Sequence, residues 1–146
     1  MTADQIARVR STWSIAMSAG DGLARAFYLR LFEQSPTAEA MFAKADPAQQ
    51  ARKLEQTLDA IVLNLHDMPA LTPDIEAMGL RHSGYGVNDG HYLLVGELLI
   101  ETIEQFVGPE FNRDDREAWR AAYAAVAEVM IGGASGGSTH VPSTGR

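Results

Sequence analysis

Residues 71–83 read LTPDIEAMGLRHS and hold the pattern that decides the fold. Leu71, Ile75 and Met78 recur at the spacing of one face of a helix, and His82 follows four residues after Met78 on that same face. An imidazole on an apolar face needs a hydrogen-bond partner or a ligand. The stretch therefore predicts a core-facing helix that carries one unusual polar group.

Helix-start signals recur along the whole chain. A capping side chain followed by proline occurs at Ser35-Pro36, Asp46-Pro47 and Thr72-Pro73. Thr2 and Gln5 match a capping box, and two asparagines, Asn88 and Asn112, precede further apolar runs. Together with apolar periodicity, these signals predict helices over about residues 3–17, 21–35, 36–42, 47–66, 73–83, 89–107 and 113–131. No stretch alternates with period two for long enough to predict a strand, so we expect an all-α fold.

Composition indicates one domain and excludes several classes of site. The chain has 146 residues, 12 Lys and Arg against 19 Asp and Glu, and no cysteine. The length fits a single domain, which we expect over residues 1–131. Residues 132–146 are rich in Gly and Ser and predict a disordered tail. Without cysteine there is no disulfide, thiolate metal site, thiol nucleophile or cysteine-ligated iron–sulfur cluster.

The charge pattern predicts neither a nucleic-acid partner nor a membrane partner. The net charge is −7, and no Lys/Arg cluster interrupts it, whereas phosphate binding needs a basic footprint. No run of 18 apolar residues predicts a membrane span. The first residues lack the basic and apolar regions of a signal peptide, so we expect a cytoplasmic protein.

Like His82, three more residues lie on or next to the apolar faces of predicted helices. Gln50 lies four residues before Leu54 on the apolar face of the predicted 47–66 helix, Tyr28 adjoins the apolar face of the second helix, and Phe42 ends the short third helix. Each has an ordinary explanation: an exposed first turn for Gln50, core packing for Tyr28 and Phe42, and for His82 a core histidine that hydrogen-bonds to the backbone. Zinc is disfavoured, because the other histidines and the carboxylates lack ligand spacing. An apolar, iron-bearing cofactor between two helices would explain all four residues at once.

The chain resembles the globin family over about residues 3–131. The resemblance is to bacterial single-domain haemoglobins and the globin half of flavohaemoglobins, with some likeness to neuroglobin. It implies a globin fold, with helices packed around a pocket for haem b (iron protoporphyrin IX). It rests on an ordered set of motifs: Phe27-Tyr28-x-x-Leu31-Phe32; Ser35-Pro36 with Phe42 six residues on; Gln50-x-x-x-Leu54; Arg81-His82-x-x-x-Gly86-Val87; His91-Tyr92-x-x-Val95-Gly96; and Trp119-x-x-x-Tyr123 with Val126-Ala127-x-Val129.

On the proximal side the resemblance implies that His82 ligates the iron. Its other ring nitrogen should donate to a backbone carbonyl one turn earlier, near Met78, which fixes the ring orientation and tautomer. Phe42 matches the phenylalanine that packs on the haem face. Val87 and Tyr92 match residues that line the ring.

On the distal side the resemblance assigns two hydrogen-bond donors. Tyr28 and Gln50 match the positions that donate to dioxygen and so slow its escape. Leu54 matches a residue that walls this pocket. Lys53 matches a partner of the haem propionates, although a solvated surface lysine explains it equally well.

The implied function is reversible binding of dioxygen and other diatomic gases (CO, NO), for oxygen binding, storage or transport. One alternative is a nitric oxide dioxygenase, which would need a separate reductase as electron donor. Flavohaemoglobins also pair a tyrosine at the Tyr92 position with a late glutamate, whose place falls near Ala134, so we do not expect a peroxidase-like push on the iron. A gas sensor or a haem-free helical interaction protein are further alternatives.

Overall fold

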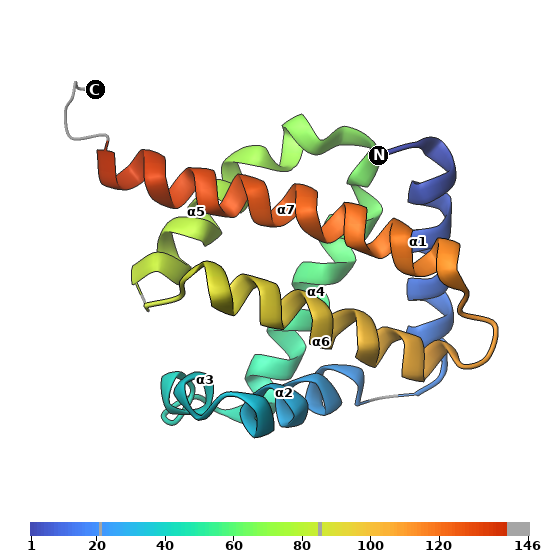
Figure 1. Ribbon diagram of the computed structural model, residues 1–146, viewed down its shortest axis with the longest axis horizontal. Coiled ribbons are helices and arrows are strands. Elements are labelled where there is room, and N and C mark those ends of the chain that lie inside the picture. The colour runs from blue at the N-terminus through green and yellow to red at the C-terminus, as the bar shows by residue number, and fades with distance from the viewer. Residues whose placement is uncertain (21, 85, 140–146) are drawn as a thin grey trace.

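The computed structural model describes residues 1–20, 22–84 and 86–139, with side chains up to residue 132. Within this part every regular element is helical, as expected from the sequence. Figure 1 shows α6 and α7 running side by side, with α2 and α3 together at one edge. The elements are α1 (Ala3–Ser18), α2 (Leu23–Gln34), α3 (Pro36–Met41), α4 (Pro47–Leu63), the short 3-10 helix η1 (Leu65–Asp67), α5 (Met68–Gly84), α6 (Asp89–Val107) and α7 (Arg113–Thr139).

Most predicted helix starts are confirmed, because the capping side chains make the expected bonds. Thr2 and Gln5 form a complete capping box at α1. Ser35 Oγ accepts from the Ala38 N–H at 3.1 Å, and Asp46 Oδ1 accepts from the Ala48 N–H at 3.2 Å. The last two helices, α6 and α7, also begin at capping boxes, which are formed by Asn88 with His91 and by Asn112 with Asp115. Each cap satisfies N–H groups that the first turn leaves free.

The predicted start of α5 at Thr72-Pro73 is wrong. The helix begins at Met68, and Pro73 lies inside it. Thr72 does not cap; its hydroxyl donates to the Met68 carbonyl at 2.9 Å within the helix. Proline removes one N–H from the ladder, and this close to the helix start the remaining bonds are sufficient to keep the helix continuous.

Two predicted helix ends also differ. The helix predicted over 47–66 stops at Leu63, because Arg10 of α1 donates to the carbonyls of Val62 at 3.2 Å and Leu63 at 2.9 Å. The end predicted at 131 is wrong as well, since α7 continues to Thr139. Extending an existing helix adds a hydrogen bond per residue without new nucleation, which outweighs the low helix propensity of the glycines. The rest of the predicted tail, 140–146, lies outside the described residues.

Two glycines let α7 approach its neighbours closely. A Cβ on Gly79 of α5 would lie 2.0 Å from the Met130 carbonyl oxygen, and one on Gly96 of α6 would lie 2.5 Å from Tyr123 Cε2. Tyr123 also donates from its hydroxyl to the Tyr92 carbonyl at 2.5 Å. These contacts dock both α5 and α6 on the long last helix.

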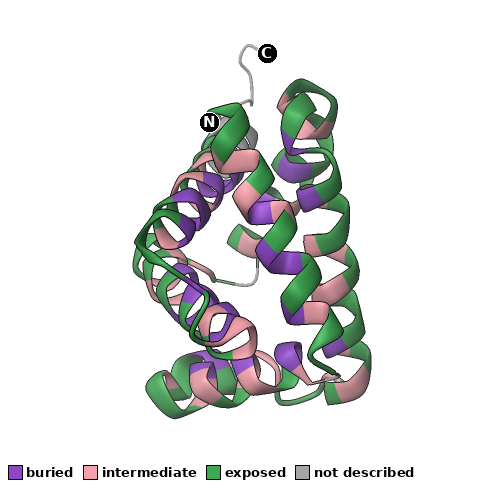
Figure 2. Ribbon diagram, turned by 90° about the vertical axis from the view of Figure 1, so that its right-hand side faces the viewer, coloured by how far each residue is buried: buried purple, intermediate pink, exposed green. Residues whose placement is uncertain are grey.

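The main core lies where α1, α2, α6 and α7 meet, and buried residues line the inward faces of the helices (Figure 2). Trp13 and Trp119 pack with ring centroids 6.1 Å apart. Their N–H groups are both satisfied, by Asp59 Oδ1 at 2.5 Å and Thr12 Oγ1 at 2.8 Å. Buried indole rings therefore join α1 to α4 and α7 without leaving an unpaired donor.

The two helices that carry Gln50 and His82 hardly touch each other. Among the described residues, α4 packs against α1 and α2, whereas α5 packs against α7, and the contacts between α4 and α5 are few. Leu54, Leu58 and Ile61 of α4 are nevertheless half-buried rather than exposed. The apolar face of α4 therefore packs mainly on the main core, whereas the apolar face of α5 packs on α7.

The Gly79 contact yields the first prediction. Gly79→Ala should lower the free energy of unfolding by about 1–3 kcal/mol, because the new Cβ meets rigid backbone and must push α5 away from α7. Gly84→Ala, on the same helix with open space around it, should leave stability unchanged or raise it slightly. Urea unfolding of both variants checks this, and equal midpoints would contradict the packing argument.

Candidate functional site

His82 lies near the end of α5, and one of its two ring nitrogens makes a hydrogen bond within the helix. Its Nδ1 is 2.7 Å from the Met78 carbonyl oxygen, one turn earlier. A carbonyl can only accept, so Nδ1 carries the proton and Nε2 keeps its lone pair. The sequence predicted this bond, and the structure confirms it. The half-buried imidazole is thus oriented by its own helix and offers Nε2 as a neutral nitrogen ligand.

Two further predicted residues lie beside His82. The Tyr92 ring of α6 is tilted by 31° to the imidazole, with centroids 6.5 Å apart. The Val87 N–H donates to the His82 carbonyl at 3.0 Å, which ties the α5–α6 connection to the end of α5. Burial, together with the charge of Asp89, raises the pKa of Tyr92 and keeps its phenol protonated.

Tyr28, on the middle of α2, lies in a group of aromatic rings. Its ring centroid is 5.3 Å from that of Phe27, 5.8 Å from Phe32 and 5.4 Å from Phe42. Phe32 and Phe42 also contact each other, at 5.8 Å. Phe42 follows the last residue of α3, so this group joins α2 to the α3–α4 connection.

The Tyr28 hydroxyl has no hydrogen-bond partner among the described residues, and burial alone raises its pKa to about 12. Tyr28 is half-buried, and a phenol hydroxyl that is partly withdrawn from water loses solvation unless some group pairs with it. The hydroxyl therefore stays protonated at neutral pH and is free to donate.

The α4 residues lie at the start of that helix. Gln50 is half-buried in the capped first turns rather than frayed, and its N–H donates to the Asp46 carbonyl at 2.9 Å. Leu54 is half-buried against the main core, and Lys53 is exposed. Because α2 and α4 pack directly together, Tyr28, Gln50 and Leu54 come from adjacent helices.

The predicted residues thus fall into two groups according to the helices that carry them. Tyr28, Phe42, Gln50 and Leu54 belong to α2–α4, whereas His82, Val87 and Tyr92 belong to α5–α6. Ile61 of α4 packs with both hydrophobic clusters of the molecule and so links the two clusters. Phe32 was not among the predicted site residues, although its position four residues after Tyr28 signalled a shared helix face.

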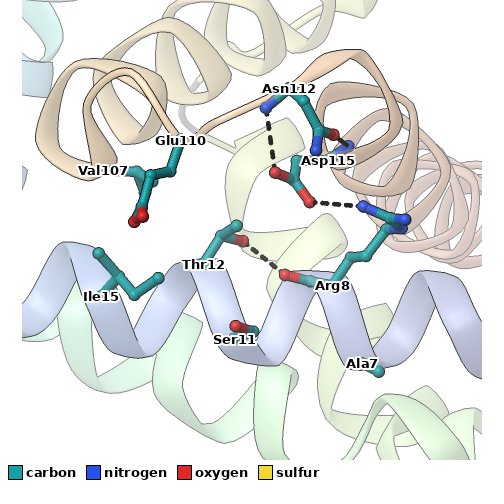
Figure 3. Close-up of a pocket in the computed structure, with 9 residues that line it drawn as sticks. All are labelled: Ala7, Arg8, Ser11, Thr12, Ile15, Val107, Glu110, Asn112 and Asp115. Atoms are coloured by element: carbon teal, nitrogen blue, oxygen red, sulfur yellow. Dashed lines mark hydrogen bonds and ion pairs between the residues drawn. The ribbon is translucent and has the colours of Figure 1, made fainter.

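A separate hollow of about 370 Å³ lies elsewhere, between α1 and the turn before α7 (Figure 3). Asp115 accepts from Arg8 Nη1 at 3.2 Å and from the Asn112 N–H at 3.0 Å, and the Thr12 hydroxyl donates to the Arg8 carbonyl at 2.7 Å. These polar groups pair with one another. The hollow therefore lies where α1 contacts the start of α7, and none of the predicted site residues lines it.

Within the described residues, no three His, Asp or Glu side chains are grouped so as to hold a metal ion by themselves. None of the described helices is long and apolar enough to cross a membrane.

The burial of Tyr28 gives a pH prediction. Tyr28 ionises near pH 10 in the unfolded chain and near pH 12 in the folded one, so its contribution to stability is complete below pH 10 and is lost as the pH rises from 10 to 12. Tyr28→Phe should therefore lose less stability than the wild type over that interval. Denaturant unfolding of both proteins at a series of pH values checks this. The other tyrosines are present in both proteins, so their titration contributes equally to the two curves. Parallel curves would contradict it.

Comparison with known proteins identifies relatives across most of the chain. Flavohemoproteins of Vibrio cholerae (29% identity, 90% of this chain, 34% of the relative), Bordetella parapertussis (29%, 86% and 32%) and Bacillus subtilis (25%, 85% and 32%) are similar to it. The chain spans about a third of the length of these curated relatives.

Solved structures share the arrangement of helices. One is an engineered carbene transferase, a proposed nitric oxide dioxygenase, from Rhodothermus marinus, with a TM-score of 0.83, 25% identity, and coverage of 97% of this chain and 98% of that one. A bacterial globin from Campylobacter jejuni has a TM-score of 0.79 at 24% identity, covering 92% and 96% of the two chains.

The globin family model matches residues 25–130, which include all the predicted site residues. The helices match the globin fold seen in the solved structures. The chain belongs to the globin family.

Proposed function

We propose that this chain binds haem b between α4 and α5 and thereby binds dioxygen and other diatomic gases, including CO and NO, reversibly. When bound, haem b supplies an iron atom at which such a gas coordinates. The observation that carries the proposal is the His82 geometry, because a bond from Nδ1 to the Met78 carbonyl leaves Nε2 free to ligate iron. No further metal ligand from the chain is required.

The residues present fit this cofactor. A flat apolar group needs two apolar walls, and the half-buried faces of α4 and α5 are supported by other helices rather than by each other. Phe42, Leu54, Val87 and Tyr92 would contact the ring, and the exposed Lys53 would reach its propionates. The unpaired Tyr28 hydroxyl is the polar group that an apolar core alone does not explain.

Tyr28 and Gln50 would act on a dioxygen molecule in the pocket. A protonated phenol donates a hydrogen bond, and an amide donates through its NH₂ group. Polarised dioxygen carries partial negative charge, so donors held in a site of low dielectric slow its release. The Nδ1–H group of His82 donates to the Met78 carbonyl, which is a neutral acceptor. This arrangement favours binding and release over oxygen–oxygen bond cleavage.

The first test is the visible spectrum of the purified, haem-supplied protein in its ferric, reduced and carbon-monoxide forms. We expect a haem spectrum that shifts on reduction and again on addition of carbon monoxide. A protein that takes up no haem after reconstitution would overturn the proposal.

His82→Ala should lower haem affinity at least about ten-fold, because it removes the axial nitrogen. His66→Ala is the matched control, since His66 is exposed and its Nδ1 lies 2.7 Å from Arg10 Nη2 of α1. Haem titration of both variants measures this. Equal affinity in the two variants would exclude His82 as the ligand.

Tyr28→Phe should speed dioxygen release about ten-fold, which corresponds to a lost hydrogen bond of about 1.4 kcal/mol. Stopped-flow displacement of dioxygen measures the rate. Carbon monoxide release is the control, because this less polar ligand accepts a weaker hydrogen bond and its rate should change much less. An unchanged dioxygen rate would show that Tyr28 is not a donor.

Nitric oxide dioxygenase activity is a second candidate function. It is supported by the flavohemoprotein relatives and by the likeness to a proposed nitric oxide dioxygenase. Such a reaction needs electrons from a reductase, which we propose to be a separate partner. Catalytic NO consumption on adding a flavin reductase and NADH would support this candidate, whereas a single stoichiometric turnover would restrict the chain to gas binding.

A further inference from the structure

The orientation of Tyr28 poses a physical problem, because no described polar group holds its hydroxyl. A phenol usually keeps its direction through a hydrogen bond from its oxygen. In this chain the ring alone must be held, by contacts to its faces and edges. Three phenylalanine rings make such contacts with Tyr28. The three rings differ in their burial and in their other roles in the structure.

Phe27 and Phe42 each have another role in the structure besides contacting Tyr28. Phe27 is 3% exposed and belongs to the main core, where it fills space between helices. Phe42 ends α3 and is among the residues proposed to contact haem. Phe32 is only half-buried, and its ring contacts both Tyr28 and Phe42, at 5.8 Å in each case.

Phe32 therefore closes a triangle of rings. Tyr28 meets Phe42 edge to face at 62°, and Phe32 is tilted by 30° to Tyr28 and by 42° to Phe42. Edge-to-face and tilted pairs at these distances are directional as well as attractive. Since Tyr28 and Phe32 are one helical turn apart, while Phe42 belongs to another element, the third ring restricts the motion of Tyr28 against the α3 end.

We propose that Phe32 is a positioning residue, whose ring holds the Tyr28 phenol in the direction from which it donates to a gas in the pocket. The inference rests on the proposed function and deepens it, since it names a residue that sets ligand retention through Tyr28. Phe32 acts on the hydroxyl by packing, in the same way that the Met78 carbonyl acts on His82 by hydrogen bonding.

Replacement of Phe32 by leucine tests this role. In the haem-loaded full chain, Phe32→Leu should speed dioxygen release about three- to five-fold, less than the ten-fold expected for Tyr28→Phe. The infrared band of bound carbon monoxide should broaden or split, because the phenol then samples several directions. Phe32→Tyr, which keeps a ring, should retain the wild-type rate and a single band.

Phe111→Leu is the matched control for loss of core packing. Phe111 is 7% exposed in the turn before α7 and stacks under Arg116 rather than near Tyr28. This variant should lose at least as much stability as Phe32→Leu in urea unfolding. Its carbon monoxide band and its dioxygen release rate should nevertheless match those of the wild type.

The decisive measurement is the double variant with Tyr28→Phe. If Phe32 acts through the Tyr28 hydroxyl, Phe32→Leu adds no further acceleration once that hydroxyl is gone. Equal acceleration in both backgrounds, or an unchanged single band in Phe32→Leu, would overturn the inference. Its failure is distinguishable from failure of the proposed function, which would appear in the wild type as no haem uptake or in Tyr28→Phe as an unchanged release rate.

Discussion

The docking of α5 on α7 at Gly79 is the contact on which the candidate site depends. Because Gly79 has no side chain, α5 lies against the Met130 backbone, and its position is set from the α7 side. Arg10 and the Trp13–Asp59 bond hold α4 to α1. Each of the two helices is thus held mainly by a different neighbour, and the contacts between α4 and α5 are few.

The two halves of the site are held by different forces. His82 is oriented by a hydrogen bond to its own helix, which also determines its tautomer. Tyr28 is oriented by packing against aromatic rings, so its hydroxyl keeps its donor capacity. A polar partner for Tyr28 within the protein would compete with a ligand. Under the proposed function, this arrangement lets Tyr28 form its hydrogen bond only when a gas enters.

Local signals predicted much of the fold and failed where a distant helix intervenes. The caps at Thr2, Ser35, Asp46 and Asn88 act within four residues of themselves and were predicted correctly. The end of α4 at Leu63 could not be predicted, because the arginine that caps it is on α1, more than fifty residues away. The start of α5 was misplaced because Thr72-Pro73 matches a capping motif equally well inside a continuous helix.

The candidate site divides in the same way. From the amino-acid sequence, the resemblance to globins predicted the candidate site residues and the His82–Met78 bond, and that bond is present because residues four apart in a helix place a side chain beside the carbonyl one turn earlier. The sequence also determined that Tyr28 lies on an apolar helix face. Only the tertiary structure decided that Tyr28 has no polar partner among the described residues, that the Phe42 ring packs against Tyr28 and Phe32, and that the contacts between α4 and α5 are few. Those features depend on how separate helices pack together, which is set by side-chain shape and close packing rather than by local periodicity.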